Sequence, residues 1–201
     1  MRSGLLLILL ALVCGAQAQG PDPVWLDSLA AYWGRMNAEY RDSTTTPLPL
    51  EARAHFTELE RFAPNADFRV TATFKAKLGK EFQMRTTTDR TPTYQPIGTL
   101  EFRLAGKKQR LTVYRSPPLS AKPEFANSLF VPFTDLTNGE ATYGGGRYLD
   151  LTGPLGPTVD LDFNKAYNPY CAYGGKYSCP LPPVENHLQV PVTAGVKAFT
   201  H

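Results

Sequence analysis

The stretch that decides the fold is "DFRVTATF", residues 67–74. An apolar residue stands at every second position in it, from Phe68 to Phe74. A period of two is typical of a β-strand that buries one face. Before Asp67 the apolar spacing is helical, so the chain changes from helix to sheet near this point. We therefore expect an N-terminal helical segment over residues 19–62 and an antiparallel β domain over residues 63–201.

Further strands are expected downstream, because short runs rich in Thr and aromatic residues are bounded by turn residues. No helical pattern separates the later runs, which argues against parallel βαβ units. We predict a mainly β fold, a single antiparallel barrel or sandwich of about eight strands with one or two N-terminal helices. The further strands are expected at Glu81–Thr88, Ile97–Leu104, Gln109–Arg115, Leu129–Phe133, Ala141–Leu151, Thr158–Phe163 and His187–Val192.

Two helices are expected before the sheet. Within residues 22–41 apolar side chains recur at helical spacing, and Asp22 before Pro23 suits an N-cap followed by proline in the first turn. Residues 46–62 have the pattern of a second, shorter helix that ends at Pro64. Both helices are expected to pack on one side or one end of the sheet.

Residues 1–18 have the features of a secretory signal peptide. Arg2 supplies a positive charge, residues 5–13 are uninterrupted apolar, and a small-x-small cleavage signal precedes Gln19. The apolar run is too short to span a bilayer. We therefore expect export to the periplasm or the outside of the cell, without a membrane span. An N-terminal lipid is expected only if Cys14 is the processed residue.

Composition and motifs exclude several function classes. The chain has 21 Lys and Arg against 18 Asp and Glu, a net charge of +3 that is too small to predict a nucleic-acid partner. The three glycines at 144–146 lack the Gly-Lys-Ser/Thr of a phosphate loop, and predict a bulge or tight bend where another backbone approaches. Standard hydrolase and redox motifs are absent, and no cofactor is expected.

The later strands carry a candidate polar site. Tyr148 and Asp150 share one face of their strand, and Asp162 and Asn164 share the polar face of the next. If these strands are neighbours, their polar faces gather carboxylates suited to a cation or to acid–base chemistry. The alternative is the solvated outer face of a half-buried sheet.

Arg147 breaks the pattern of its strand, since it shares the apolar face with Leu149. A buried unpaired charge is costly and is avoided. We predict a buried or half-buried ion pair of Arg147 with Asp162 or Glu185. The alternative is that the preceding glycines bend the strand and turn Arg147 to solvent.

Cys171 and Cys179 remain after loss of the signal peptide. Oxidising compartments favour a disulfide, which closes a short loop and stabilises the fold by about 2.5 kcal/mol. The alternatives are a zinc site that includes His187, a Cys171 nucleophile served by His187 and an Asn, or two reduced buried thiols. The spacing matches no common metal site, so we expect a disulfide and no metal.

Three segments carry a combined signature: "LFVPFTDLTNGEATYGGGRYLDL" at 129–151, "VDLDFNKAYNPYCAY" at 159–173, and "CPLPPVENHL" with "VTAG" at 179–195. Together they resemble the bacterial domain-of-unknown-function family sixteen-eighty-four, from about His55 to the C-terminus. The chain departs from this pattern at Val196, where the family usually has Glu after Ala-Gly. The resemblance implies no particular activity.

Two function classes remain open on the sequence. The first is an exported binding module that holds an unknown small molecule in a polar, aromatic concavity. The second is a hydrolase-like enzyme that pairs Asp150 or Asp162 with Glu185; a structural cell-envelope protein is a further alternative. The lack of a catalytic signature favours the binding module. Its expected lining is Tyr143, Arg147, Tyr148, Asp150, Asp162, Asn164, Tyr167, Asn168, Glu185 and Asn186.

Overall fold

The fold is described from a computed structural model over residues 22–200, so the predicted signal peptide lies outside the described residues. The helices are α1 (Pro23–Arg41), α2 (Leu50–Arg53) and α3 (Pro117–Ser120). The strands are β1 (Arg69–Ala76), β2 (Phe82–Gln83), β3 (Thr93–Leu104), β4 (Lys107–Arg115), β5 (Ser128–Phe133), β6 (Arg147–Thr152) and β7 (Thr158–Asp162). Single 3₁₀ turns occupy Ala66–Phe68, Pro123–Phe125, Phe163–Lys165, Tyr170–Ala172 and Val184–Asn186.

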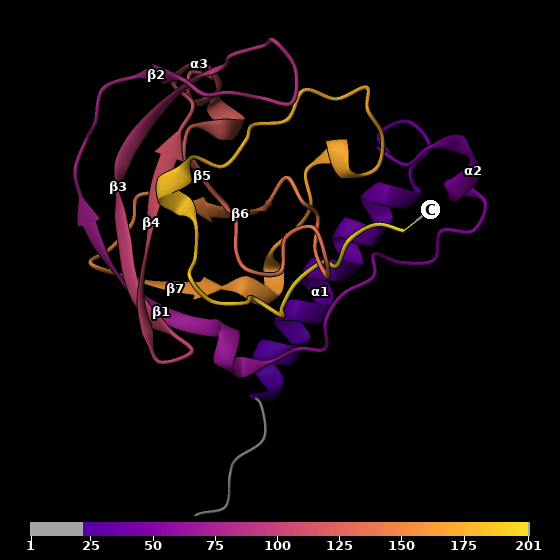
Figure 1. The fold of residues 1–201 in the computed structure, drawn as a ribbon, viewed down its shortest axis with the longest axis horizontal. Coiled ribbons are helices and arrows are strands. Elements are labelled where there is room, and N and C mark those ends of the chain that lie inside the picture. Colours follow the sequence, from indigo (N-terminus) through magenta and orange to yellow (C-terminus); the bar gives the residue numbers. More distant parts are fainter. Residues whose placement is uncertain (1–21, 201) are drawn as a thin grey trace, which may run out of the picture.

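Within residues 22–200, seven strands form one antiparallel sheet that curls into a half-barrel (Figure 1). The order is β6-β5-β4-β3-β1-β7, and β2 pairs with β3. The longest ladder joins β3 to β4 through a tight turn in which Ala105 and Gly106 have φ of 48° and 74°. Two successive positive φ values give a turn whose twist matches that of paired strands. The predicted mainly β antiparallel class is confirmed, as one open curled sheet.

Two predicted strands are shorter in the structure. The one predicted at Glu81–Thr88 shortens to β2, and the one predicted at Ala141–Leu151 begins only at Arg147. Gly146, just before it, has φ of 89°, and a Cβ there would lie 2.6 Å from the carbonyl oxygen of Phe133. The glycines therefore form the tight bend that was predicted, because only glycine tolerates both the conformation and the close approach.

The strand predicted at His187–Val192 is wrong as a strand, although its alternation is real. The chain makes one isolated β-bridge, between Thr134 and His187, and then runs inside the curled sheet. Its apolar side chains there pack in the core of the sheet. Its buried residues are Leu188, Val190, Val192 and Ala194. A period of two therefore marks an extended, buried chain here, whose backbone finds partners other than a neighbouring strand.

Helix α1 packs at the β7 end of the sheet (Figure 1). The Asp22 side chain caps it by accepting a backbone hydrogen bond of 3.0 Å from the first turn, and Pro23 stands at the first helical position. Both features were predicted. Buried Trp25, Leu29 and Trp33 repeat every four residues and form the inward face of the helix, which packs in a cluster with the loop after β7.

The second helix predicted within residues 46–62 is much shorter, since only Leu50–Arg53 is helical. The side-chain oxygen of Asn37 in α1 accepts a hydrogen bond of 2.9 Å from the backbone N–H of Leu59. This contact holds the residues after α2 against α1 in a non-helical course. Tertiary contacts thus override a local helical pattern.

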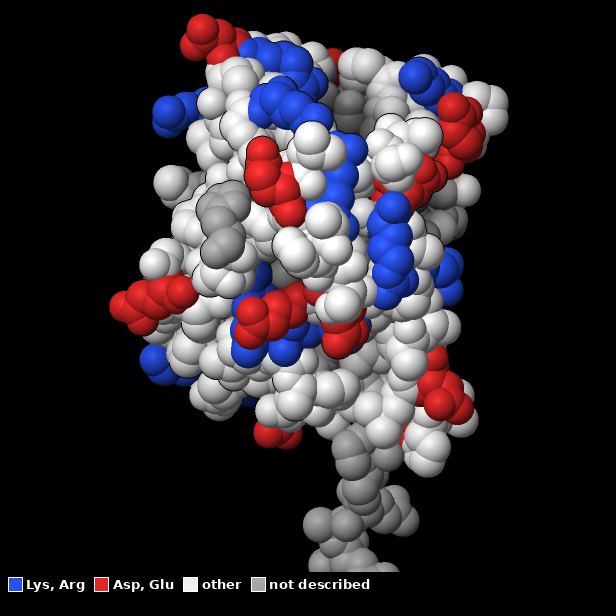
Figure 2. All heavy atoms as spheres, turned by 90° about the vertical axis from the view of Figure 1, so that its right-hand side faces the viewer, with Lys and Arg blue, Asp and Glu red and all other residues white. Residues whose placement is uncertain are grey.

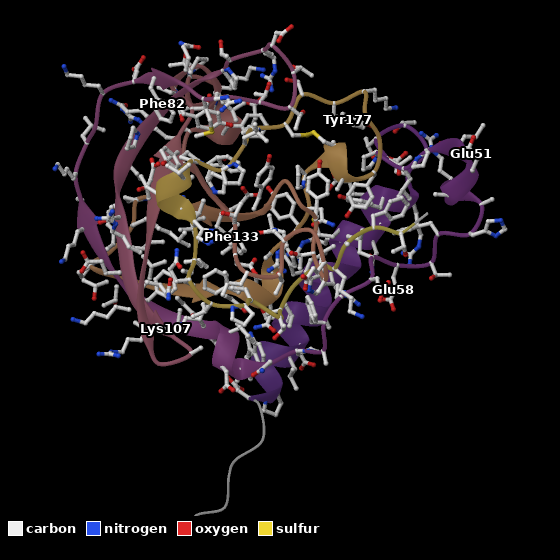
Figure 3. All side chains as sticks on the ribbon, in the orientation of Figure 1. Glu51, Glu58, Phe82, Lys107, Phe133 and Tyr177 are labelled. Carbon is white, nitrogen blue, oxygen red and sulfur yellow. A yellow bond between two sulfur atoms is a disulfide. The ribbon has the colours of Figure 1, made fainter. Side chains whose placement is uncertain are left out.

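The interior contains two apolar clusters. One fills the curl of the sheet and includes Phe133 (Figure 3). The other joins α1 to the loop after β7, with Trp33, Tyr40 and Tyr173 among its buried rings. On the face that carries α1 and α2, cationic and anionic side chains are interspersed (Figure 2). No helix within residues 22–200 is both long and apolar enough to cross a membrane.

Candidate functional site

Arg147 and Asp135 form an ion pair in the interior. Nη2 of Arg147 lies 2.9 Å from Oδ2 of Asp135, and both side chains are 0% exposed. The prediction of a buried pair for Arg147 is confirmed, but the predicted partners Asp162 and Glu185 are wrong. Arg147 stands opposite Phe133 in the β5–β6 register, and Asp135 follows two residues later, which brings the two charges together.

The guanidinium of Arg147 also binds the extended C-terminal segment. Its N–H groups donate to the carbonyl oxygens of Val192 at 2.8 Å and Val196 at 3.3 Å, and to that of Ala194. Asp135 accepts a hydrogen bond of 3.1 Å from the N–H of Val192. Burial lowers the pKa of Arg147, and the Asp135 carboxylate acts in the opposite direction. The pair thus supplies hydrogen bonds that a neighbouring strand would otherwise give.

Asp162 and Asn164 fasten α1 to the end of β7. The Asp162 carboxylate accepts hydrogen bonds from the indole N–H of Trp25 at 2.8 Å and from the backbone N–H of Asn164 at 3.0 Å. The carbonyl of Asn164 accepts from the indole of Trp33 at 3.1 Å. The Asn164 amide bonds the backbone of Asn65 in both directions, at 2.9 Å each. Both predicted site residues are therefore buried in structural contacts.

Asn186 and Asn168 are also buried and bind backbone groups. Strands β4 and β5 pair at a single register position, and Asn186 fills the gap between them. Its amide accepts from the N–H of Thr112 and donates to the carbonyl of Pro132, both at 2.7 Å. Asn168 donates to the carbonyl of Lys197 at 2.8 Å. Both amides therefore replace missing backbone partners.

Glu185 and Tyr143 lie in loops. Glu185 is exposed and accepts a hydrogen bond of 2.8 Å from the hydroxyl of Tyr114 on β4. The half-buried Tyr143 opens the glycine bend, and its carbonyl accepts from the amide of Asn138 at 2.7 Å. Since Asp162 is tied to α1 and Glu185 to β4, different elements hold these two carboxylates.

Two other predicted residues, Tyr148 and Tyr167, line an open aromatic pocket of about 290 Å³. Its rings pack in series: the centroid distance is 5.5 Å from Tyr94 to Phe130 and 4.7 Å from Phe130 to Tyr148. A further 5.8 Å separates Tyr148 from Tyr167. The six aromatic residues that line the aromatic pocket are Tyr94, Phe130, Tyr148, Tyr167, Tyr170 and Tyr177. They come from β3, β5, β6 and the loop after β7.

A disulfide bond closes the loop that forms one wall of the aromatic pocket. Cys171 and Cys179 are bonded, with Cα atoms 6.2 Å apart, as predicted. Two backbone N–H groups fasten this loop to the chain after β2: that of Thr87 donates to the Cys179 carbonyl at 2.9 Å, and that of Cys179 to the Thr87 hydroxyl at 3.1 Å. Figure 3 shows Tyr177 next to the disulfide. The bonded sulfurs leave no thiolate for zinc or for nucleophilic attack.

Asp150 adjoins two residues that line the aromatic pocket, Phe130 and Tyr167. In the sheet it stands opposite Phe130, on the same face of β6 as Tyr148. Its carboxylate accepts a hydrogen bond of 2.7 Å from the hydroxyl of Tyr167. None of the ion pairs within residues 22–200 includes Asp150. Desolvation raises the pKa of Asp150, and the Tyr167 hydrogen bond offsets part of that effect.

Three pocket hydroxyls already donate to acceptors of the protein itself. The pairs are Tyr148 to the carbonyl of Pro180, Tyr167 to Asp150, and Tyr170 to Glu39 of α1. Burial is the largest cause that raises the pKa of each of these phenols, so all three stay protonated at neutral pH. At these three positions the aromatic pocket therefore presents ring surface rather than free hydroxyl donors.

A larger groove of about 860 Å³ lies between the α2 region, which carries Glu51 and Glu58 (Figure 3), and the C-terminal residues. Glu58 and Glu60 on its wall already form ion pairs with Arg61 and Lys197, at 2.8 Å and 2.7 Å. Across the described part of the chain, no group of three His, Cys, Asp or Glu is placed to hold a metal. The aromatic pocket is therefore the stronger candidate.

The predicted lining did not include four of the pocket's aromatic residues, Tyr94, Phe130, Tyr170 and Tyr177. Tyr94 lies in β3, but Pro96 interrupts the strand pattern, so the predicted strand began only at Ile97. Phe130 was in a predicted strand, between buried Leu129 and Val131. A large aromatic residue on the opposite face from two buried aliphatic residues was the available signal.

The fold and the aromatic pocket define a class: a curled antiparallel sheet with a disulfide-closed aromatic hollow on one side. The chain belongs to the family described as "Protein of unknown function (DUF1684)", whose model matches residues 54–197. The resemblance predicted from the motifs is thus confirmed.

A similar solved structure is the solution NMR structure of the uncharacterized protein from gene locus rrnAC0354 of Haloarcula marismortui. It has 36% sequence identity and a TM-score of 0.69, and the match covers 87% of this chain and 94% of that one. No curated protein matches the chain.

Proposed function

We propose that this protein is an exported binding module that holds a small ligand in the aromatic pocket. The observation that carries the proposal is the convergence of six aromatic side chains from separate elements on one open hollow of about 290 Å³. Five of these rings are only half-buried, so apolar surface remains that a ligand can cover. The volume is near the lower end of ordinary small-molecule sites.

A binding role accounts for the carboxylates better than hydrolysis by a carboxylate pair. Both oxygens of Asp162 already accept hydrogen bonds, from Trp25 and from Asn164. Glu185 is engaged by Tyr114 on β4. A general acid and base must converge on one substrate, whereas of these three carboxylates Asp150 is the one that is hydrogen-bonded to a lining residue of the aromatic pocket, Tyr167.

Export is the second part of the proposal. A disulfide between Cys171 and Cys179 is typical of an oxidising compartment. The predicted signal peptide adds to this, with Gln19 as the first residue of the mature protein. Mass measurement of the exported protein tests it. A chain that keeps Met1, or one that begins at a lipid-modified Cys14, would contradict this part.

Chemical-shift mapping tests the binding function. The ¹⁵N-labelled mature chain, with its disulfide formed, is titrated with a mixture of neutral, cationic and anionic small molecules. We expect the perturbed amides to cluster in β6 and residues 167–180.

Phe130→Leu removes a pocket ring and should weaken these perturbations. Phe125→Leu is the matched control, since Phe125 is 38% exposed and outside the pocket lining. Perturbations that avoid the aromatic pocket, or that both variants weaken equally, contradict the binding function.

A further inference from the structure

We propose that the ligand of the aromatic pocket is an organic cation, a quaternary or protonated amine, whose charge lies against the rings beside Asp150. This inference rests on the proposed binding function and adds the chemical class of the ligand. It follows from the arrangement of π faces and carboxylates, and from the orientation of the hydroxyl groups around them.

The rings present their faces in more than one direction. Phe130 and Tyr148 are inclined by 74°, and Tyr148 and Tyr167 by 88°. On the other wall Tyr170 and Tyr177 are inclined by 67°. A ring face carries negative potential and attracts a cation within about 6 Å of its centroid. Edge-to-face packing in series therefore allows one compact cation to contact several ring faces.

Two carboxylates increase this negative potential. Asp150 accepts from Tyr167, and Glu39 accepts from Tyr170. Neither carboxylate takes part in an ion pair within residues 22–200. A phenol that donates its proton to a carboxylate has a more electron-rich ring, so these hydrogen bonds strengthen the attraction of both rings for a cation.

Two cationic side chains, Lys176 and Arg90, lie near the aromatic pocket. Nζ of Lys176 is 5.2 Å from the ring centroid of Tyr177, so this ring already attracts a cation of the protein. The guanidinium of Arg90 donates to the carbonyl of Ser178 at 2.7 Å and to the Ser178 hydroxyl at 3.1 Å, which turns two of its donors to the loop. Neither cation forms an ion pair with Asp150 or Glu39 within residues 22–200.

The hydroxyl groups argue against an anionic ligand. An anion needs hydrogen-bond donors, but Tyr148, Tyr167 and Tyr170 already donate to Pro180, Asp150 and Glu39. The Asp150 charge next to the lining residues would also repel an anion. A cation needs no donor from the protein, and it would give Asp150 the counter-charge that it lacks within residues 22–200.

An isosteric pair of probes separates charge from shape. Choline carries a quaternary ammonium, and 3,3-dimethylbutan-1-ol has the same shape with a neutral carbon in its place. Binding of each to the mature chain is measured by calorimetry or by chemical-shift titration. We expect choline to bind at least about tenfold more tightly, because several ring faces and a carboxylate contribute.

Substitutions locate the source of this preference. Asp150→Asn should weaken choline binding about five- to tenfold and leave the neutral probe unchanged. Asp27→Asn is the matched control, since Asp27 is an exposed carboxylate on α1. It should change neither affinity. Tyr94→Leu should weaken both probes, and choline more.

Acidification gives an independent test, because choline keeps its charge at every pH. The pKa of Asp150 is raised by desolvation, so its charge is lost at a higher pH than that of an ordinary carboxyl. Choline affinity should fall as the pH drops through this range, and Asp150→Asn should flatten the profile. The other charged or titratable groups near this face are Tyr32, Arg35, Glu39, Arg90, Tyr94, Tyr148, Asp162, Tyr167, Tyr170, Lys176 and Tyr177.

The outcomes distinguish the two proposals. Equal binding of both probes in the aromatic pocket overturns the cation inference and leaves the binding function intact. Binding of other small molecules, with no response to choline, has the same meaning. If no small molecule perturbs the aromatic pocket, both proposals fail.

Discussion

Strand β6 carries two charged residues in opposite environments, one buried and one exposed. Arg147 faces the interior, where its side chain is 0% exposed and paired with Asp135. Asp150, three residues later, projects from the other face beside the aromatic pocket and has no cationic partner within residues 22–200. An odd separation on a strand places two side chains on opposite faces.

The two residues differ in role: Arg147 stabilises the fold, whereas Asp150 belongs to the proposed ligand site. Arg147 has its counter-charge and several carbonyl partners within the fold, so its charge is balanced without a ligand, although its Nε has no hydrogen-bond partner. Within residues 22–200 the Asp150 carboxylate has one hydrogen-bond partner, the phenol of Tyr167, and it keeps exposed surface. The Asp150 carboxylate has no counter-ion within residues 22–200 and lies beside half-buried rings, so it can still interact favourably with a ligand.

The largest effect is expected for Arg147→Ala. The change leaves Asp135 as an uncompensated buried charge and removes donors from the carbonyls of the C-terminal segment. Breaking a buried pair from one side costs about 3–5 kcal/mol. Urea unfolding, followed by the fluorescence of Trp25 and Trp33, measures it.

Two companion variants make this test robust if the alanine variant fails to fold. Arg147→Lys keeps the charge but loses the planar fork, and should cost less than Arg147→Ala. The double variant Arg147→Met with Asp135→Leu removes both charges and should cost less than the sum of the single changes. An unfolding midpoint that Arg147→Ala does not move would show that the pair contributes nothing to stability.

The disulfide comes next in expected size. Replacing Cys171 and Cys179 by serine reopens a short loop, and the chain-entropy model gives a loss of about 2.5 kcal/mol. The same change should weaken binding at the aromatic pocket, because the loop carries Tyr170 and Tyr177. Thiol titration of the denatured wild type without reductant should find no free thiol. Two reactive thiols in that assay would show that Cys171 and Cys179 are not bonded.

The two indoles of α1 allow a matched comparison of acceptors. Trp25→Phe deletes an N–H that donates to the carboxylate of Asp162, whereas Trp33→Phe deletes one that donates to the carbonyl of Asn164. A hydrogen bond to a charged group contributes about 1.5–3 kcal/mol and a neutral one about 0.5–1.5 kcal/mol. Trp25→Phe should therefore be the more destabilising of the two in urea unfolding. The reverse order would mean that ring packing, and not the charged acceptor, dominates.

Local pattern predicted the elements that depend on it. The alternation around Phe68 identified the sheet, Asp22 with Pro23 identified the start of α1, and the two cysteines identified the disulfide. Each of these signals lies within about ten residues of chain and has a direct physical cause. They sufficed for the class of fold.

Pairings between distant residues were not available from local pattern. A need for a partner at Arg147 followed from its apolar face, but the partner depends on the β5–β6 register, which places Asp135 there instead of Asp162 or Glu185. Alternation at residues 187–192 could not show that a guanidinium replaces the neighbouring strand. The aromatic pocket could not be predicted for the same reason, since Tyr94 and Tyr177 come together only in the folded sheet.

The smallest effect is expected for Asp150→Asn, and its sign is informative. The pKa of Asp150 is raised in the folded protein, so the folded state binds the proton more tightly than the unfolded chain. Stability of the wild type should therefore fall as the pH rises from the ordinary carboxyl pKa through the raised folded value. The asparagine has no charge to desolvate. The free energy of unfolding of the variant should therefore rise relative to that of the wild type as the pH increases through this range.

Because Asp150 keeps exposed surface, water screens the charge and the difference at neutral pH should stay within about 0.5 kcal/mol. Unfolding of both proteins at a series of pH values measures it, with Asp27→Asn as the control that should show no such trend. A variant that is destabilised by several kcal/mol would place Asp150 with Arg147, among the charges that hold the fold together. A neutral or stabilising change, combined with loss of choline affinity, is the result expected of a charge reserved for a ligand.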